Sequence, residues 1–255
     1  MQAIISLTTD YGIKDHYVAA FKAKLMQRFG NIPVLDISHS VSPYNIIEAA
    51  LFVKSIKKHC LENTIHLIDV DHAGGNMQLI WINRDNQYFV MPDNGMISLI
   101  FPDCYKYPVF KLPYAEEDLR FLNMQDLFIH VADRLINEAS IGSESTNYMQ
   151  SQTFNPIITG DTVHVSVIYV DQYSNAILNI DFEQFEKLRN GRRFEISIQR
   201  QFTVNRISAS YAQVHENELC CIVNDAGHLE LCMNKAKLAQ LFSLGFGSEM
   251  LIDFQ

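Results

Sequence analysis

Residues 6–12 read SLTTDYG, and this stretch decides how the 255-residue chain is expected to fold. It continues a short apolar run at residues 3–7, a pattern typical of a first strand that ends in a turn. Asp10 then stands at the carboxyl end of that strand, the edge of an open α/β sheet where ligands bind. Because its two oxygens can accept hydrogen bonds from adjacent hydroxyls, Asp10 is a candidate for holding a ribose diol. The alternative is that Asp10 caps a helix beginning near Asp15.

Segments with the spacing of helices and strands alternate along the first half of the chain, which predicts a doubly wound α/β domain. The strand at residues 64–70 is apolar enough to lie centrally in a parallel sheet. The remaining predicted elements are helices at residues 15–28, 44–59 and 127–139, a strand at residues 33–38, and a hairpin formed by residues 79–83 and 87–91.

The second half has a different pattern. Ser, Glu, Asn and Gln dominate from about residue 140 to residue 155, where we place a linker between a domain of residues 1–145 and one of residues 156–255. Beyond it, short alternating runs predict a small C-terminal β-barrel or sandwich. These runs lie at residues 161–171, 176–180, 194–198, 201–207, 219–223 and 228–233.

Composition narrows the classes of function. The hydrophobic fraction is 48%, and the net charge of −9 comes without a dense Lys/Arg cluster, so no nucleic-acid partner is expected. The chain has no apolar run long enough for a membrane span and no signal-like start, which predicts a cytoplasmic protein without a membrane partner. The five cysteines are an odd number without a CxxC pair, so we expect free thiols and no metal site.

Three further polar stretches are candidate parts of a site: VDHAGG (residues 70–75), PDNG (residues 92–95) and VDQYSN (residues 170–175). The first follows the third strand on the same edge as Asp10, and its glycines would let a ligand approach the backbone. The third combines an aromatic ring that can stack on a purine with an amide that can bond its edge. Ordinary turns are the alternative interpretation of all three. GxGxxG, P-loop, HExxH and GxSxG patterns are absent from the sequence.

Taken together, several motifs resemble those of the S-adenosylmethionine hydroxide adenosyltransferase family, whose relatives include fluorinases and chlorinases. The matching stretches cover nearly the whole chain and are LTTDYG (7–12), KDHYVAAFK (14–22), DISHSVSPYNIIEAA (36–50), IHLIDVD (65–71), PDNG (92–95), VDQYSNAILNI (170–180), SYAQV (210–214) and GHLELCMN (227–234).

The resemblance implies an α/β first domain, a β-barrel second domain, and a homotrimer with active sites between neighbouring subunits. It implies no cofactor, because S-adenosylmethionine is the substrate that water or hydroxide cleaves at C5′. The residues that it places around the substrate are Asp10 at the ribose, Tyr44 beside the adenosine, Asp171 at the methionine amino group, and Tyr173, Asn175 and Tyr211 around the adenine.

At the catalytic positions the sequence departs from the family pattern. Asp71 matches the family's Asp, but Gln78 stands where an Arg is expected and Asn123 where a His is expected, with Gln125 at a second Arg. Gln and Asn can orient a water molecule but cannot carry charge or take a proton at neutral pH. His72, next to Asp71, is the nearest candidate base.

Three functions are therefore open. The chain is a variant hydrolase that releases adenosine and methionine slowly, or a non-catalytic receptor for S-adenosylmethionine or adenosine. A chlorinase is the weaker alternative, because the sequence specifies no halide-binding donor set.

Overall fold

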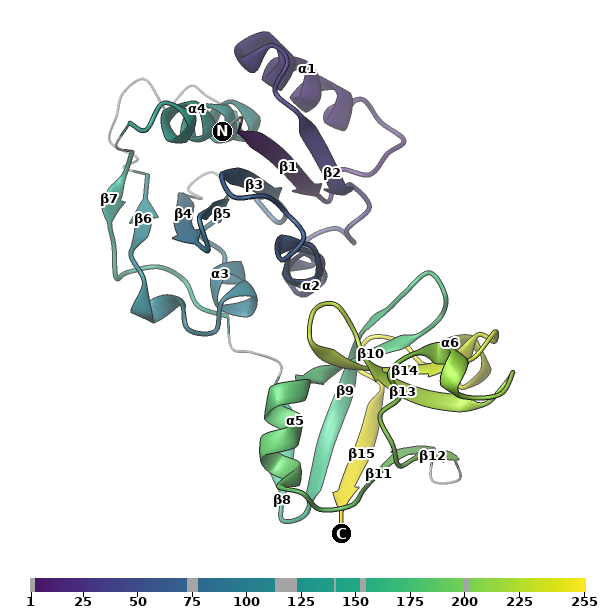
Figure 1. Cartoon of the computed structure of the whole chain (residues 1–255). Coiled ribbons are helices and arrows are strands. Elements are labelled where there is room, and N and C mark those ends of the chain that lie inside the picture. Colours follow the sequence, from purple (N-terminus) through teal and green to yellow (C-terminus); the bar gives the residue numbers. More distant parts are fainter. Residues whose placement is uncertain (1–2, 73–77, 113–122, 140, 152–154, 200–201) are drawn as a thin grey trace. The chain divides into compact units, whose positions relative to one another are not determined.

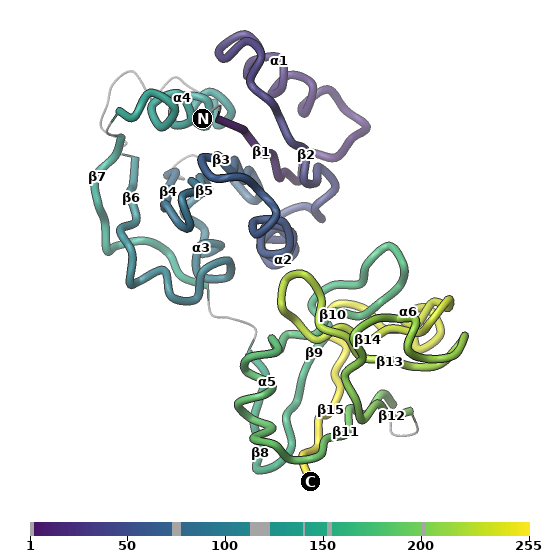
Figure 2. The backbone as a smooth tube through the Cα atoms, in the orientation of Figure 1, coloured from purple at the N-terminus to yellow at the C-terminus, as the bar shows by residue number. Residues whose placement is uncertain are grey.

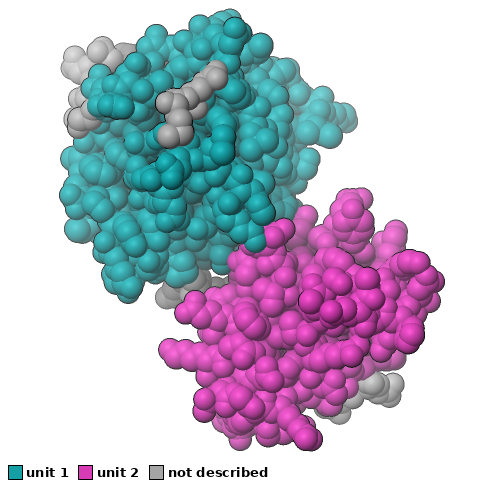
Figure 3. All heavy atoms as spheres, viewed as in Figure 1, with its two compact units in different colours: residues 1–151 teal, residues 152–255 magenta. Residues whose placement is uncertain are grey.

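The computed structural model describes residues 3–72, 78–112, 123–139, 141–151, 155–199 and 202–255. The chain forms two compact units, residues 1–151 (unit 1) and residues 152–255 (unit 2), which are coloured separately in Figure 3.

Unit 1 contains a mixed sheet whose strand order, over the residues described, is β2-β1-β3-β5-β4-β6-β7 (Figure 1). The first four strands in this order are parallel, and β4, β6 and β7 run antiparallel to their neighbours. The strand direction reverses at the β4–β5 hairpin, which confirms the predicted hairpin. The strands are β1 (Ile4–Thr9), β2 (Val34–Ser38), β3 (Thr64–Asp69), β4 (Leu79–Arg84), β5 (Gln87–Pro92), β6 (Val109–Lys111) and β7 (Ser143–Glu144).

Helices cover both faces of this sheet (Figure 1). The core between the sheet and the helices α1 and α4 includes Phe21 and Phe128, and the core beneath α2 and α3 includes Ala50 and Ile97. Residues of β3 alternate between the two cores, as expected for a central strand with both faces buried. The predicted α/β fold is confirmed. The helices are α1 (Tyr17–Phe29), α2 (Ile46–Lys57), α3 (Met96–Ile100) and α4 (Met124–Ile136).

The ends of two helices differ from the sequence prediction because side-chain caps set them. The Asn123 side chain accepts a hydrogen bond from the Asp126 N–H at 3.1 Å, so α4 begins three residues before its apolar pattern does. Asn45 accepts in the same way from the Glu48 N–H at 3.1 Å, so α2 begins at Ile46 and not at Tyr44.

Part of the stretch predicted as a linker is built into unit 1. Residues 143–144 form β7, which pairs with β6. The Met149 N–H donates to Asp93 Oδ1 at 2.7 Å, and the Ser151 N–H donates to Ser98 Oγ at 3.0 Å. Residues 141–151 therefore extend unit 1, although their polar composition is that of a connecting segment.

Unit 2 is a nearly closed antiparallel sheet with strand order β12-β11-β15-β9-β10-β14-β13 in its described part, with β8 paired to β9 (Figure 2). A parallel bridge between Ile207 and Cys221 brings the chain after β12 to β13, which confirms the barrel prediction. The strands are β8 (Ile157–Thr159), β9 (Thr162–Val170), β10 (Ala176–Asp181), β11 (Phe194–Ile198), β12 (Phe202–Val204), β13 (Leu219–Val223), β14 (His228–Met233) and β15 (Glu249–Phe254).

Helices α5 (Phe182–Arg189) and α6 (Leu238–Leu241), together with β8 and β15, were not predicted. Phe185 of α5 is fully buried in the barrel core, and Asp181 caps the helix by accepting from the Gln184 N–H at 2.7 Å. All five cysteines are free, with Cys60 half-buried and the others buried. Among the helices described, none has the length and apolar character to span a bilayer.

Candidate active site

An open cleft in unit 1 lies where the first and third strands end. Because β1 and β3 are parallel with Thr9 opposite Asp69, the residues that follow each strand meet at the same edge of the sheet. The cleft has a volume of about 590 Å³. It is lined by Asp10, Tyr11, Tyr17, Pro43, Tyr44, His72, Asn123, Met124 and Gln125.

Asp10 holds two loops at this edge. Its Oδ2 accepts hydrogen bonds from the N–H groups of Tyr44 at 3.0 Å and Asp71 at 3.3 Å. The capping alternative is wrong, because α1 begins at Tyr17 and has His16 at its cap position. Since Oδ2 is already occupied, Oδ1 is the oxygen that Asp10 can offer a ligand from this position.

Asp71 and Tyr44, whose N–H groups donate to Asp10, have positive φ angles of 55° and 64°. Burial, together with the nearby charge of Asp10, raises the pKa of the Asp71 carboxyl. The Asn94 amide donates to the carbonyl oxygens of Val70 at 3.0 Å and Asp71 at 3.4 Å. The PDNG stretch thus forms a bend, and its Asn94 side chain fixes the end of β3.

Asp69 and Tyr11 belong to this site although sequence reasoning missed both. Asp69 is fully buried, and its two oxygens accept from the Tyr11 hydroxyl and from His72 Nδ1. The bond to Asp69 raises the pKa of His72, and burial, followed by the charge of Asp69, raises the pKa of Tyr11. The sequence signal was available, because an Asp inside the apolar run LIDV needs a buried partner.

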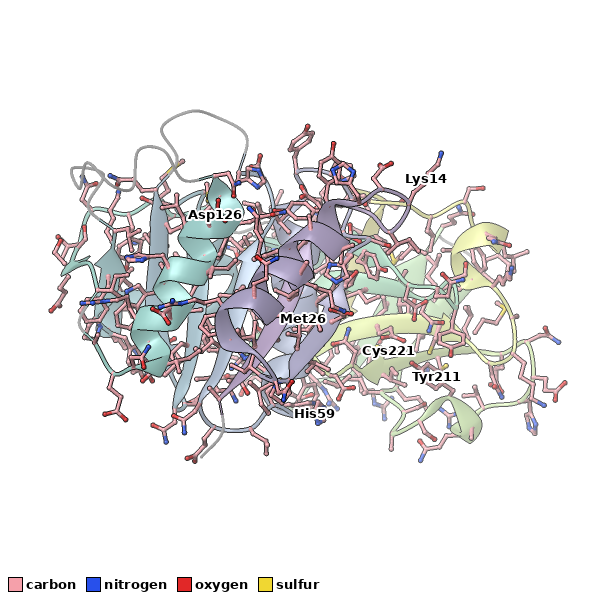
Figure 4. The ribbon with its side chains drawn as sticks, turned by 90° about the horizontal axis from the view of Figure 1, so that it is seen from above. Lys14, Met26, His59, Asp126, Tyr211 and Cys221 are labelled. Carbon is pink, nitrogen blue, oxygen red and sulfur yellow. The ribbon has the colours of Figure 1, made fainter. Side chains whose placement is uncertain are left out.

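The structure does not bring together the residues that differ from the family pattern at the catalytic positions. Asn123 lines the cleft, but its Oδ1 caps α4 and also accepts from Lys24 Nζ at 3.2 Å. Lys24 also pairs with Asp126 at 2.8 Å. Figure 4 labels Asp126, which lies in the first turn of α4. Gln78 is not a lining residue, and its carbonyl oxygen accepts from the Asp93 N–H at 2.8 Å. Gln125 lies at the cleft, while residues 73–75 of the VDHAGG stretch fall outside the described residues.

A second cavity, of about 500 Å³, lies in unit 2 and brings together three of the predicted adenine-site residues. Its lining residues are Gln172, Tyr173, Asn175, Tyr211, Met233, Asn234, Lys235, Ala236 and Lys237. Tyr173 is 77% exposed, so its ring is free to stack on a planar ligand.

Asp171 and Asn175 close a tight loop at the rim of this cavity. The Asn175 backbone N–H and side-chain amide donate to the two Asp171 carboxylate oxygens at 2.7 and 3.0 Å. The loop is a hydrogen-bonded turn, as the alternative interpretation predicted. Because the amide N–H is engaged, the Asn175 carbonyl oxygen is the group that suits a ligand's amino donor.

Glu230 fixes Tyr211 beside the same cavity. It is 5% exposed, and its Oε1 accepts from the Tyr211 hydroxyl at 2.8 Å. Figure 4 labels Tyr211 on unit 2. Burial raises the pKa of Glu230, because a desolvated carboxylate is disfavoured.

This raised pKa predicts how the stability of unit 2 depends on pH. The folded state binds more protons than the unfolded state between the unfolded pKa, about 4.3, and the higher folded pKa. The free energy of unfolding therefore falls as pH rises through this window. Replacing Glu230 by Gln should remove that fall. Compared with wild type at the same pH, the free energy of unfolding of the variant should therefore be larger at pH 7.5 than at pH 4.

Urea unfolding of the full chain at several pH values, followed by circular dichroism, checks this prediction. The matched control is Glu216→Gln, because Glu216 is an exposed carboxylate paired with Lys235 on the same unit. Equal pH dependence of Glu230→Gln and wild type would show that Glu230 titrates normally.

Two models of known protein domains match this chain. The model of the SAM hydroxide adenosyltransferase N-terminal domain matches residues 5–144, and that of the C-terminal domain matches residues 165–251. The chain belongs to the SAM hydroxide adenosyltransferase family. Both cavities lie within the two matched domains of this family.

Two relatives named as hydrolases align along nearly the whole chain. A protein of Methanocaldococcus jannaschii named (R)-S-adenosyl-L-methionine hydrolase is 22% identical over 97% of this chain and 94% of its own length. One of Salinispora tropica with the same name is 24% identical over 96% of each. A solved structure of an uncharacterized conserved protein from Thermotoga maritima superposes with a TM-score of 0.82 at 25% identity, covering 98% of this chain and all of the other.

Proposed function

We propose that this protein hydrolyses S-adenosylmethionine to adenosine and methionine. The observation that carries the proposal is the full-length similarity to proteins named (R)-S-adenosyl-L-methionine hydrolase. The charge at the cleft supports it, because Asp10, Asp69 and Asp71 cluster there around the imidazole of His72. Such a site favours a cationic sulfonium substrate.

In the proposed reaction, a water oxygen forms a bond to C5′ while the C5′–S bond breaks. The bonding electron pair goes to sulfur, which becomes the neutral thioether of methionine, and one water proton is released. The sulfonium is already a good leaving group. The protein therefore needs mainly to align water with C5′ and to exclude stray solvent.

We assign the binding roles as follows. Asp10 Oδ1 accepts from the ribose diol, and Tyr44, exposed at the rim, packs against the nucleoside. In unit 2, Asp171 attracts the methionine amino group. The adenine lies among Tyr173, Asn175 and Tyr211, with its amino group donating to the Asn175 carbonyl oxygen.

Each unit carries only part of this binding set, which leads us to propose a homotrimer in which neighbouring subunits complete each site. Light scattering of the purified protein in solution tests this proposal. A monomer at the concentrations used for activity measurements would refute it.

The proposed enzyme is either slow or uses other residues in place of two catalytic groups of the family pattern. Asn123 uses its Oδ1 to cap α4 and cannot act as a base, and Gln78 supplies no positive charge. Losing a positioned base or a charged stabiliser typically reduces a rate by about 10²- to 10⁴-fold. Asp71, with its raised pKa, orients the water in this proposal.

Chromatography of adenosine formed from S-adenosylmethionine, with protein equimolar to substrate, tests the activity. Adenosine and methionine in equal amounts, above a no-protein background, are expected. The second candidate is a binding protein without activity, because Asn123 Oδ1 is engaged in capping α4. Saturable heat of S-adenosylmethionine binding in calorimetry, with no adenosine formed, would favour it. Formation of 5′-chloro-5′-deoxyadenosine only with chloride would show a chlorinase.

A further inference from the structure

Tyr11 and His72, which line the unit 1 cleft, share the buried carboxylate of Asp69. Asp69, the last residue of β3, is fully buried. One of its oxygens accepts from Tyr11 and the other from His72 Nδ1. The rings of Tyr11 and His72 pack edge to face, with their centroids 6.2 Å apart. A buried carboxylate with a donor on each oxygen is held in a single orientation.

This contact fixes which nitrogen of His72 is available for chemistry. A neutral imidazole carries one N–H, and the carboxylate holds that hydrogen on Nδ1. The lone pair is then on Nε2. The His72 side chain is 36% exposed and lines the cleft, so it is within reach of a water molecule there.

We propose that Asp69 positions His72 as the general base that activates the attacking water, with Tyr11 holding the second oxygen of Asp69. This inference rests on the proposed hydrolysis and supplies the base that Asn123 lacks. As the water oxygen bonds to C5′, its proton moves to Nε2 of His72, and the C5′–S electron pair goes to sulfur. The Nδ1 proton stays between His72 and Asp69, and the Nε2 proton later passes to solvent.

The groups that face His72 set the pH at which this base works. Its hydrogen bond to Asp69 and the charges of Asp69, Asp10 and Asp71 all favour the protonated imidazole, and partial burial opposes them. The pKa of His72 is accordingly above its ordinary value of 6.5. Since the base must be neutral, the rate should rise with pH and level off above this pKa.

The first experiment is single-turnover hydrolysis of S-adenosylmethionine across pH. His72→Gln should reduce kcat by about 10²- to 10⁴-fold and abolish the rise with pH, while calorimetry shows substrate affinity within about threefold of wild type. The matched control is His130→Gln on α4, a histidine outside the cleft lining, which should behave as wild type.

The second experiment measures the His72 pKa by NMR titration, which needs no turnover. Asp69→Asn removes the carboxylate and should lower that pKa, together with the inflection of the rate. Tyr11→Phe frees one oxygen of Asp69 from a donor, which strengthens the attraction for the imidazole proton, and should raise the pKa. Opposite shifts from two variants exclude a general loss of folding as their cause.

The outcomes separate this inference from the function on which it rests. A wild type that forms no adenosine overturns both. A wild type that forms adenosine, combined with His72→Gln that keeps the full rate and the same pH profile, overturns the inference alone. An unchanged His72 pKa in Asp69→Asn also overturns it.

Discussion

Replacing Asp10 by alanine is expected to weaken the binding of S-adenosylmethionine and of adenosine by about 10- to 100-fold. A hydrogen bond to a charged group contributes about 1.5–3 kcal/mol, and the variant leaves ribose hydroxyls without this acceptor. It also releases the N–H groups of Tyr44 and Asp71 from Oδ2. Two loops at the cleft then lose their common anchor, which adds to the loss.

Calorimetry with adenosine and with 2′-deoxyadenosine separates these two effects. Wild type should prefer adenosine, whereas Asp10→Ala should bind the two equally weakly, because the partner of the 2′-hydroxyl has gone. Asp15→Ala is the matched control, since Asp15 is an exposed carboxylate on the same connection and does not line the cleft. Unchanged affinity in Asp10→Ala would mean that the ribose binds elsewhere.

The sequence predicted the sheet edge that carries this site because local patterns determine it. Apolar runs locate β1 and β3, and parallel pairing then brings the residues after each strand to one edge. The barrel was predictable from alternation for the same reason. Helix starts were predicted less well, because α2 and α4 begin directly after Asn caps, which apolar periodicity does not mark.

Contacts between distant segments were not predictable from local pattern. Asp69 looked like one position in an apolar strand, and its role follows only from Tyr11 and His72 reaching it. The polar residues 141–151 looked like a linker because their packing is made by backbone N–H groups, such as that of Met149, which composition does not reveal. The roles of the binding residues in substrate recognition stay predictions.

Replacing Gly95 by alanine is expected to destabilise unit 1 by about 3 kcal/mol, the upper range for strained backbone positions. Gly95 has φ of +93°, a conformation that L-residues rarely adopt. A Cβ there would lie 2.7 Å from the backbone nitrogen of Ser151 and 3.2 Å from the Gln150 carbonyl carbon. These are backbone atoms, so no flexible side chain can move aside.

Thermal unfolding of the full chain should show the transition of unit 1 lowered by about 5–10 °C. Gly12→Ala is the matched control, because Gly12 also has a positive φ, of +73°, but a Cβ there meets nothing within 4 Å. It should cost only about 1 kcal/mol, the lower end for a strained backbone position. An equal loss in both variants would mean that backbone conformation alone matters and that Ser151 can yield. If Gly95→Ala is the more destabilised, its affinity for substrate should fall too. The adjacent Asn94 side chain donates to the carbonyl groups of Val70 and Asp71. A shift of Asn94 would therefore disturb the loop that Asp10 holds.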